Sequence, residues 1–313
     1  MKKVIILVVL ACVVGAAAFL VQSALYESQR ADYGWRPVVE APAFTAEHPR
    51  VLVDAAHGNA STIGIAGRYW PFGRLLRADG YSVAECRKPF TLERLEGVQV
   101  LVIANASGAP RPQLFGFNLP VSTDKKRSDP AFTNAEILAV RSWVEQGGSL
   151  LLIADHAPFG EAAAALGTAF GITMHKGFTE VPGESSDPLL FSAQNGRLAD
   201  HPIVAGDGKT TLVRRVTTFT GQSLDGPPGA TALLRLPDTA IEFVPVADSL
   251  AAQPAGPAQG LAFEWGKGRV VALGEAAMLT AQTHKGIPFG MNTPDNDNRQ
   301  FALNTMHWLS RKL

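Results

Sequence analysis

Apolar runs that alternate with helical segments are the feature that most constrains the fold of this chain. Runs at 51–53, 98–104 and 149–154 are rich in Val, Leu and Ile and contain no charged residue. Strands that are apolar at consecutive positions are buried on both faces, which is typical of a parallel sheet covered by helices. The sequence therefore predicts an α/β domain with a parallel sheet flanked by helices.

The segment 131–146 carries the clearest helix signals. Thr133 is predicted to cap it, Glu136 stands three residues later as the second half of a capping box, and Gly147-Gly148 follows as a stop. The other predicted helices cover residues 69–80, 161–170 and 298–311.

The region 177–259 is less regular than the rest. Strands at 212–220 and 232–236 are expected to form an antiparallel extension of the sheet, and the composition of 250–260 predicts a mobile loop. The pattern recovers with a strand at 261–265, a hairpin turn at 266–268 and a strand at 269–273.

Charge and cysteine content exclude several classes of protein. The 28 basic residues equal the 28 acidic ones, and no polybasic run is present, so nucleic acid is not an expected partner. Of two cysteines, Cys12 lies in the hydrophobic leader, which leaves Cys86 alone in the domain and predicts no internal disulfide.

The N-terminus predicts attachment to the cytoplasmic membrane. Two lysines precede an uncharged apolar run, Val4–Val21, whose length is at the short end for a transmembrane helix. Ala16–Ala18 would suit a signal peptidase, but the run continues beyond them, which favours an uncleaved anchor. The lysines should stay in the cytoplasm. The domain would then lie in the periplasm or outside, and cleavage would release an exported soluble form.

These signals predict three parts of the chain. We expect an anchor or signal segment at 1–25, a linker at 26–48 and one folded domain at 49–313.

Polar residues follow each apolar strand at its carboxyl end, where parallel sheets bind ligands. They are Asp54, His57 and Asn59 after the first strand, Asn105 after the second, Asp155 and His156 after the third, and Glu275 after the last. Gln282 and Asn292 lie in polar clusters that follow Glu275. Each of these residues taken alone could have a purely structural role, since Asp, for example, commonly caps a turn or helix. Their combination predicts a shared pocket.

Four segments carry a resemblance to a known family. They are 51–59 (VLVDAAHGN), 147–156 (GGSLLLIADH), 200–203 (DHPI) and 266–271 (GKGRVV). In their order, the chain resembles the class I glutamine-amidotransferase-like superfamily, within it a bacterial domain-of-unknown-function family (4350-like), and more distantly trehalose-utilisation-type proteins. The resemblance covers residues 50–313 and implies a flavodoxin-like sheet.

The chain departs from that family at the reactive position. The resemblance implies a nucleophilic cysteine at the turn after 149–154, where this chain has Asp155-His156, and a His-x-Glu pair after a later strand, where it has Glu275 without the histidine. Without a thiolate, covalent glutamine hydrolysis cannot proceed.

Three functions stay open at this point. The first is binding of a small polar ligand, such as a carbohydrate or cell-envelope fragment, by Asp54, His57, Asn59, Asn105, Gln282 and Asn292. The second is metal-dependent hydrolysis, with Asp155, His156 and Glu275 as catalytic candidates and His57, Asp155 and His156 as candidate ligands of a divalent metal. The third is an assembly role in an envelope complex.

Overall fold

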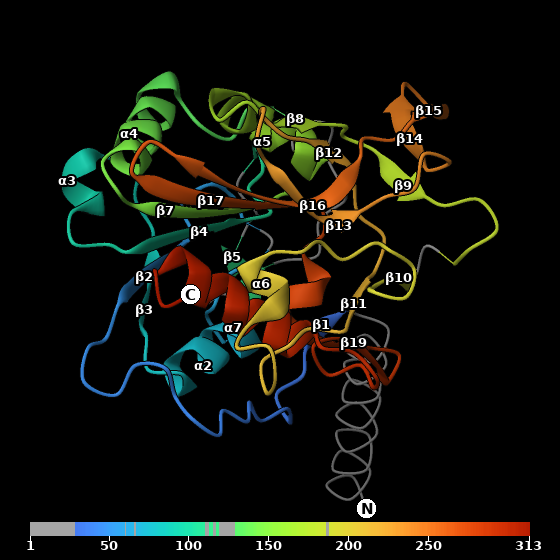
Figure 1. Cartoon of the computed structure of the whole chain (residues 1–313). Helices are drawn as coiled ribbons and strands as arrows, with labels where there is room; N and C mark the ends of the chain where they lie inside the picture. The colour runs from blue at the N-terminus through green and yellow to red at the C-terminus, as the bar shows by residue number, and fades with distance from the viewer. Residues whose placement is uncertain are drawn as a thin grey trace, which may run out of the picture.

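The computed structural model describes residues 29–59, 61–65, 67–109, 129–185 and 188–313, with the backbone of β5 (Gln113–Leu114) and β6 (Phe117–Asn118). A nine-stranded sheet forms the middle layer, and helices cover both of its faces (Figure 1). The prediction of an α/β domain is therefore confirmed.

Five neighbouring strands of this sheet are parallel. They are β3 (Ser82–Cys86), β2 (Arg50–Asp54), β4 (Val100–Ala104), β7 (Ser149–Ile153) and β17 (Gly268–Leu273), in that spatial order. Numbered along the chain, their order is 2-1-3-4-5, which is the flavodoxin-like arrangement. All five carboxyl ends consequently meet at one edge of the sheet.

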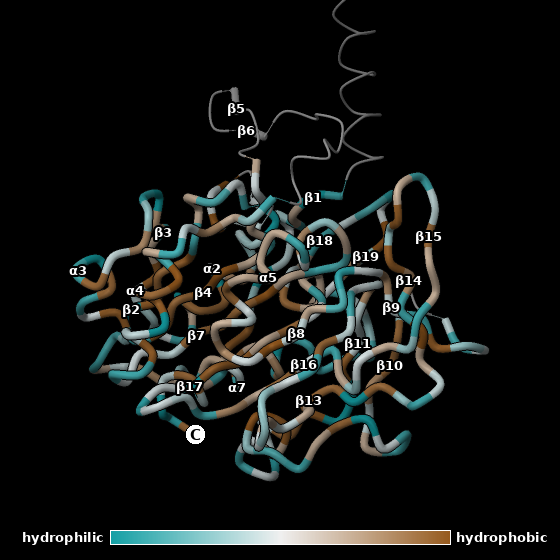
Figure 2. The backbone as a smooth tube through the Cα atoms, turned by 90° about the horizontal axis from the view of Figure 1, so that it is seen from above, coloured by the Kyte–Doolittle hydropathy of each residue, from teal (hydrophilic) through white to brown (hydrophobic). Residues whose placement is uncertain are grey.

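Each central strand supplies both hydrophobic cores, because alternate side chains point to opposite faces. In β4, Leu101 and Ile103 join one core while Val100 and Val102 join the other, and all four are fully buried. Figure 2 shows the hydrophobic course of β4 and β7 through the interior. The continuous apolar runs of the sequence have this origin.

Helices lie over the two faces as the sequence predicts. On one face lie α3 (Leu92–Leu95), α4 (Asn134–Glu145) and α5 (Phe159–Ala169), and on the other lie α2 (Trp70–Ala78) and α7 (Asn298–Leu309) (Figure 1). The capping box predicted for α4 is present, with both reciprocal hydrogen bonds between Thr133 and Glu136.

The predicted antiparallel extension is present for the strand at 232–236, which is β13 (Thr231–Arg235), but the strand predicted at 212–220 lies outside the sheet as β11 (Arg215–Thr218). β16 (Ala258–Trp265) pairs with β17 through the predicted hairpin, and β12 (Leu224–Asp225), β13 and β8 (Thr173–Met174) continue the sheet. Outside the sheet, β10 (Leu189–Ser192) and β11 form a separate two-stranded ribbon, and α7 packs against β11.

The mobile loop predicted at 250–260 is wrong. β15 (Ser249–Pro254) pairs with β14 (Ile241–Val246), which pairs with β9 (Phe178–Glu180), and β16 begins at Ala258. Every residue of β15 is exposed. A strand that is exposed along its whole length shows no hydrophobic alternation, so β15 carries no sequence signal.

The segment predicted as a linker contacts the domain directly. β1 (Arg30–Ala31) pairs with β18 (Ala281–His284), which forms a hairpin with β19 (Ile287–Gly290). The Asp79 carboxylate accepts a hydrogen bond from the Ala43 amide at 2.9 Å. The short elements η2 (Ala277–Leu279) and α6 (Pro202–Ala205) complete the fold.

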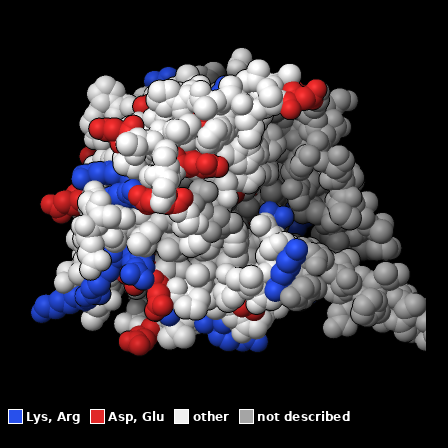
Figure 3. Space-filling model, turned by 90° about the vertical axis from the view of Figure 1, so that its right-hand side faces the viewer, with Lys and Arg blue, Asp and Glu red and all other residues white. Residues whose placement is uncertain are grey.

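No helix in the part of the chain that the structure describes is long and apolar enough to cross a membrane. The anchor predicted at 1–25 lies outside the described residues. On the face drawn in Figure 3, basic and acidic side chains are interspersed rather than gathered by sign.

Candidate functional site

Three predicted site residues form a closed cluster beside β2, at the point where the strand order reverses. The His57 Nδ1 atom lies 2.8 Å from Asp54 Oδ1, and its Nε2 atom lies 2.7 Å from Glu136 Oε1. The Asn59 amide donates to Asp54 Oδ2 and to the Ala104 carbonyl. Phe90 and Phe132 pack against the imidazole, with ring centroids 4.8 and 4.7 Å away. Both ring nitrogens are therefore occupied by the protein itself.

The two carboxylates favour the charged form of His57. Burial opposes the positive charge, but hydrogen bonds and charges of Asp54 and Glu136 outweigh it and raise the pKa of His57. Burial would raise the pKa of Glu136, yet hydrogen bonds from Thr133 and His57 lower it. The cluster is an internal ion pair that ties β2 to α4, and its polar groups face one another rather than a ligand.

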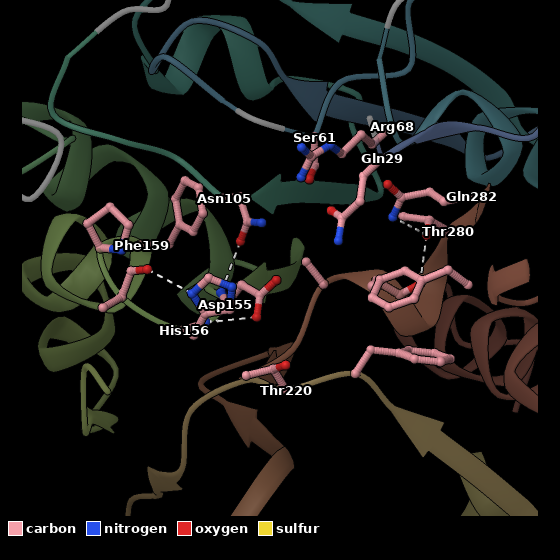
Figure 4. Close-up of a pocket in the computed structure, with 16 residues that line it drawn as sticks. Gln29, Ser61, Arg68, Asn105, Asp155, His156, Phe159, Thr220, Thr280 and Gln282 are labelled. Carbon is pink, nitrogen blue, oxygen red and sulfur yellow. Dashed lines mark hydrogen bonds between the residues drawn. The ribbon is translucent and has the colours of Figure 1, made fainter. Parts of the chain in front are cut away.

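An open cavity of about 280 Å³ lies above the ends of β4, β7 and β17 (Figure 4). Its wall combines charged, amide, hydroxyl and aromatic groups from six segments of the chain. They are Gln29 before β1, Ser61 and Arg68 after β2, Asn105 after β4, Asp155–Phe159 after β7, Phe219 and Thr220 after β11, and Ala276, Ala277, Thr280, Gln282 and Phe289 from η2, β18, β19 and their turns.

The ends of β4 and β7 are locked together on one side of the cavity. Asn105 has a φ of 49°, a left-handed conformation that asparagine tolerates better than most residues. In this conformation its side-chain oxygen accepts the Asp155 amide at 2.9 Å. Asp155 Oδ1 in turn accepts the His156 amide at 2.8 Å. The predicted residues Asn105, Asp155 and His156 thus form one continuous wall.

His156 has a defined orientation in this wall. Its Nδ1 atom lies 2.8 Å from the Ala157 carbonyl, which can only accept, so Nδ1 carries a proton. Its ring stacks on Phe178 at 4.8 Å between centroids. In the neutral ring the lone pair is therefore on Nε2, which has no hydrogen-bond partner among the described residues.

Gln282 forms the opposite wall and has an unsatisfied atom. Its side-chain amide donates to Thr280 Oγ1 at 2.7 Å, while its Oε1 atom is buried and has no hydrogen-bond partner in the part of the chain that the structure describes. The residue as a whole is only 2% exposed. Asn292, also a predicted site residue, stands behind this wall and donates to the Gln282 carbonyl at 2.9 Å and to Asp32.

Glu275 contributes to the frame of the cavity. Its two carboxylate oxygens accept the amides of Ala277 and Met278, both at 2.7 Å, and so fix the η2 turn whose alanines line the cavity. Burial, with the negative charges of Glu275 and Asp155, raises the pKa of Tyr69 well above its usual value. The protonated Tyr69 hydroxyl donates to the Ala276 carbonyl at 2.9 Å.

The described side chains do not offer a metal centre. Across the part of the chain that the structure describes, no three His, Cys, Asp or Glu side chains are grouped so as to hold a metal ion. The candidate ligands are divided, because His57 lies in the closed ion-pair cluster while Asp155 and His156 lie in the cavity wall. A metal-dependent hydrolase draws no support from this arrangement.

Several cavity residues carry no signal in the sequence. Ser61 and Arg68 lie in an irregular loop, and Gln29 lies about 20 residues before the predicted start of the domain at 49. Only the pairing of β1 with β18 brings Gln29 to the site. By contrast, Asn105, Asp155 and Gln282 were predictable because each follows or lies in an expected element near the strand ends.

Fold and site together define an α/β domain with flavodoxin-like strand order and a polar cavity at its strand ends. No protein-family model and no curated protein matches the sequence. Among solved structures, the N-terminal domain of mmIFT52 is similar, with 16% identity and a TM-score of 0.54, over 83% of this chain and 97% of that one. At that identity the likeness shows the fold alone.

Two further solved structures are similar at lower TM-scores. A ThuA-like protein from Bacteroides uniformis has 13% identity and a TM-score of 0.44, over 89% of this chain and 95% of its own. A GMP-synthase-like protein from Thermoplasma acidophilum has 11% identity and a TM-score of 0.43, over 86% of this chain and 96% of its own.

Proposed function

We propose that this chain is a membrane-anchored, extracytoplasmic relative of the amidotransferase-like proteins that binds a small, hydroxyl-rich ligand of carbohydrate type in the strand-end cavity. The observation that carries the proposal is made at Gln282, a cavity-lining residue whose buried Oε1 atom has no hydrogen-bond partner among the described residues. Buried polar atoms are almost always hydrogen-bonded, and leaving one unmade costs about 1–3 kcal/mol. A ligand hydroxyl would supply the missing donor.

The rest of the wall suits such a ligand. Asp155 and Gln282 carry acceptors, and the Ser61 hydroxyl makes no hydrogen bond to another described residue. Phe219 and Phe289 supply an apolar face, with ring centroids 4.3 Å apart. Sugars combine hydroxyl groups that donate and accept with an apolar ring face.

The proposed function does not include covalent amidotransferase chemistry, because the cysteine of the domain does not line the cavity. The single cysteine of the domain, Cys86, ends β3 and donates to the Lys88 carbonyl, away from the cavity-lining residues. Burial raises the pKa of its thiol, which disfavours the thiolate. The position after β7 belongs to Asp155-His156 instead.

The test compares two substitutions that each remove a buried atom without a partner. Gln282→Met removes Oε1 from the cavity wall, and Thr305→Val removes the equally unpartnered Thr305 Oγ1 from α7, outside the cavity. Thr305→Val loses only an atom without a partner, whereas Gln282→Met also loses the hydrogen bond from Nε2 to Thr280 Oγ1. We therefore expect Gln282→Met to lower stability by about 1 kcal/mol and Thr305→Val by less. Only Gln282→Met should abolish ligand binding.

Binding is measured by calorimetry and by thermal unfolding with neutral hexoses, N-acetylhexosamines and hexuronic acids. We expect at least one sugar class to raise the Tm of the wild type and of Thr305→Val but not of Gln282→Met. The proposal fails if no sugar binds the wild type, or if Gln282→Met responds as the wild type does.

A further inference from the structure

The route by which the chain enters the domain begins at the cavity. Gln29 lines the cavity and is exposed, so it lies at the rim. Two residues later, Ala31 is buried and pairs with Gln282, the residue with the unpartnered oxygen in the opposite wall. The N-terminal segment is therefore part of the binding site and enters from its mouth.

The length of chain before Gln29 limits how far the cavity can lie from a membrane. The apolar run ends at Val21, which leaves eight Cα–Cα steps to Gln29. Fully extended, eight steps span at most about 26–29 Å. A compact domain of about 280 residues has a radius of gyration of roughly 19 Å, hence a diameter near 50 Å. The tether is thus too short for the opposite side of the domain to reach the bilayer.

The surface around this entry has the composition of a membrane interface. Ile65 and Ile287 are 71% and 66% exposed, the largest values among the exposed large apolar side chains of the described residues, and Tyr33 is 42% exposed. They belong to neighbouring segments: the Tyr33 hydroxyl donates to the Ile65 carbonyl, and Ile287 lies on the β18–β19 hairpin that pairs with β1.

Aromatic and basic groups complete this surface. Tyr33 packs edge-on against Trp70 with centroids 5.2 Å apart, and the guanidinium of Arg74 lies 4.6 Å from the Trp70 ring. Arg30 and Arg36 are exposed on the same N-terminal segment. Tyrosine and tryptophan with basic residues beside them are enriched where proteins meet lipid headgroups.

Resting on the proposed function, we propose that the cavity faces the bilayer and takes the sugar headgroup of a membrane-embedded glycolipid rather than a freely diffusing sugar. Tyr33, Ile65 and Ile287 would insert at the headgroup level and hold the rim against the membrane. A headgroup carried by the same bilayer reaches the cavity at a high effective concentration. Binding would need no release of the lipid from the membrane.

Orientation is tested on the full chain in nanodiscs of phosphatidylethanolamine and phosphatidylglycerol. A fluorophore is placed at Ile65→Cys or Ile287→Cys, in a background that carries Cys12→Ala and Cys86→Ala. Matched controls are Leu138→Cys on α4 and Leu250→Cys on β15, which are 62% and 57% exposed and lie in the half of Figure 1 opposite β1 and β19. We expect headgroup spin labels to quench positions 65 and 287 at least twofold more than positions 138 and 250. Equal quenching at all four positions overturns the proposal.

The source of the ligand is tested separately from binding itself. The Tm of the full chain is measured in discs with and without monoglucosyl diacylglycerol, and in plain discs with free methyl glucoside. We expect the glycolipid, at a lower total concentration than the free glycoside, to raise the Tm of the wild type but not of Gln282→Met. A response to the free glycoside alone overturns this inference and leaves the proposed function intact. No response to either overturns both for glucose-type headgroups.

Discussion

The pKa values of two histidines in this protein are shifted in opposite directions because their neighbours differ. His57 lies between Asp54 and Glu136, which raise its pKa against the effect of burial. At His201, burial and then the charge of Arg269 lower the pKa to about 4, with only Asp200 acting against them. At the scale of single residues, then, charge of the immediate partners rather than burial alone decides which form of the imidazole the fold stabilises.

We predict that His57→Ala destabilises the fold by about 3–5 kcal/mol near pH 6, because two buried carboxylates lose their cation. Because the pKa of His57 is raised, the stability that His57 contributes is complete below pH 6.5 and is lost as the pH rises through the pKa of the folded state. The lowered pKa of Glu136 makes its contribution present above pH 4.5 and lost at lower pH. Urea unfolding from pH 4 to 9 should show the largest difference from wild type between pH 4.5 and 6.5.

His175→Ala is the matched control for this experiment. His175 Nε2 lies 2.6 Å from Asp225 Oδ2, but the aspartate side chain is 48% exposed. Exposed ion pairs contribute about 1 kcal/mol or less. Equal costs for the two substitutions, or a His57→Ala cost that does not change with pH, would refute the ion-pair interpretation of the cluster.

The sequence predicts which residue types gather at the strand ends but not how they pair. Asp54 and His57 follow β2 as expected, yet their role depends on Glu136, 79 positions further along the chain from His57. The sequence marks Glu136 as part of a capping box, and the structure shows that it serves both the cap and the histidine. Pairings over such separations follow from tertiary packing, which periodicity does not encode.

At the scale of elements, prediction succeeds where burial leaves a pattern. The strands β4 and β7 are buried throughout and β2 is buried except at Arg50, and all three read as apolar runs. The sequence also marks where α4 begins and ends, through its capping box and the Gly147-Gly148 stop. The ribbon of β14 and β15 has neither kind of signal, since β15 is exposed along its length. Its turn uses Ala247 at a φ of 51°, where glycine or asparagine would have been recognisable.

The short helix α6 has a pH-sensitive start. His201 is its N-cap, and the ring Nδ1 atom accepts the Ile203 amide at 3.2 Å, which requires the neutral imidazole. Because its pKa is lowered to about 4, the stability that His201 contributes is present above pH 6.5 and lost as the pH falls towards 4. Asparagine caps equally well and does not titrate.

We therefore predict that His201→Asn makes the protein less sensitive to acid. Between pH 7 and pH 4 the variant should lose about 1–2 kcal/mol less than the wild type, once solvent screening of this partly exposed ring is allowed for. The substitution also removes the contact of the His201 ring with Trp308, whose ring centroid lies 5.1 Å away. This loss lowers the free energy of unfolding by an amount that does not vary with pH. Parallel curves of unfolding free energy against pH for the two proteins would contradict the prediction.

At the scale of the whole molecule, the N-terminal segment belongs to the domain rather than to a linker. β1 completes a three-stranded sheet with β18 and β19, and Trp35 and Val39 pack against the core beneath α2 and α7. The sequence reads as a tether here because prolines interrupt any period. Its strand β1 pairs with residues about 250 positions away, which no local pattern can show.

This arrangement predicts different outcomes for two truncations. A chain that begins at residue 29 keeps β1, Trp35 and Val39, and should unfold at the Tm of the domain in the full chain. A chain that begins at residue 41 loses about 2 kcal/mol of apolar burial and uncovers one edge of β18. For a domain of this size, its Tm should fall by roughly 4–8 °C.

The same pair of truncations separates a structural role of the segment from a role in binding. Removing residues 1–40 takes away Gln29 at the cavity rim and the strand that holds Gln282 in place, so the sugar that stabilises the longer chain should no longer stabilise the shorter one. If both chains had the same Tm and the same ligand response, the segment would be a linker after all. The cavity would then be complete without it, and its position at the membrane would not be fixed by the path of the chain.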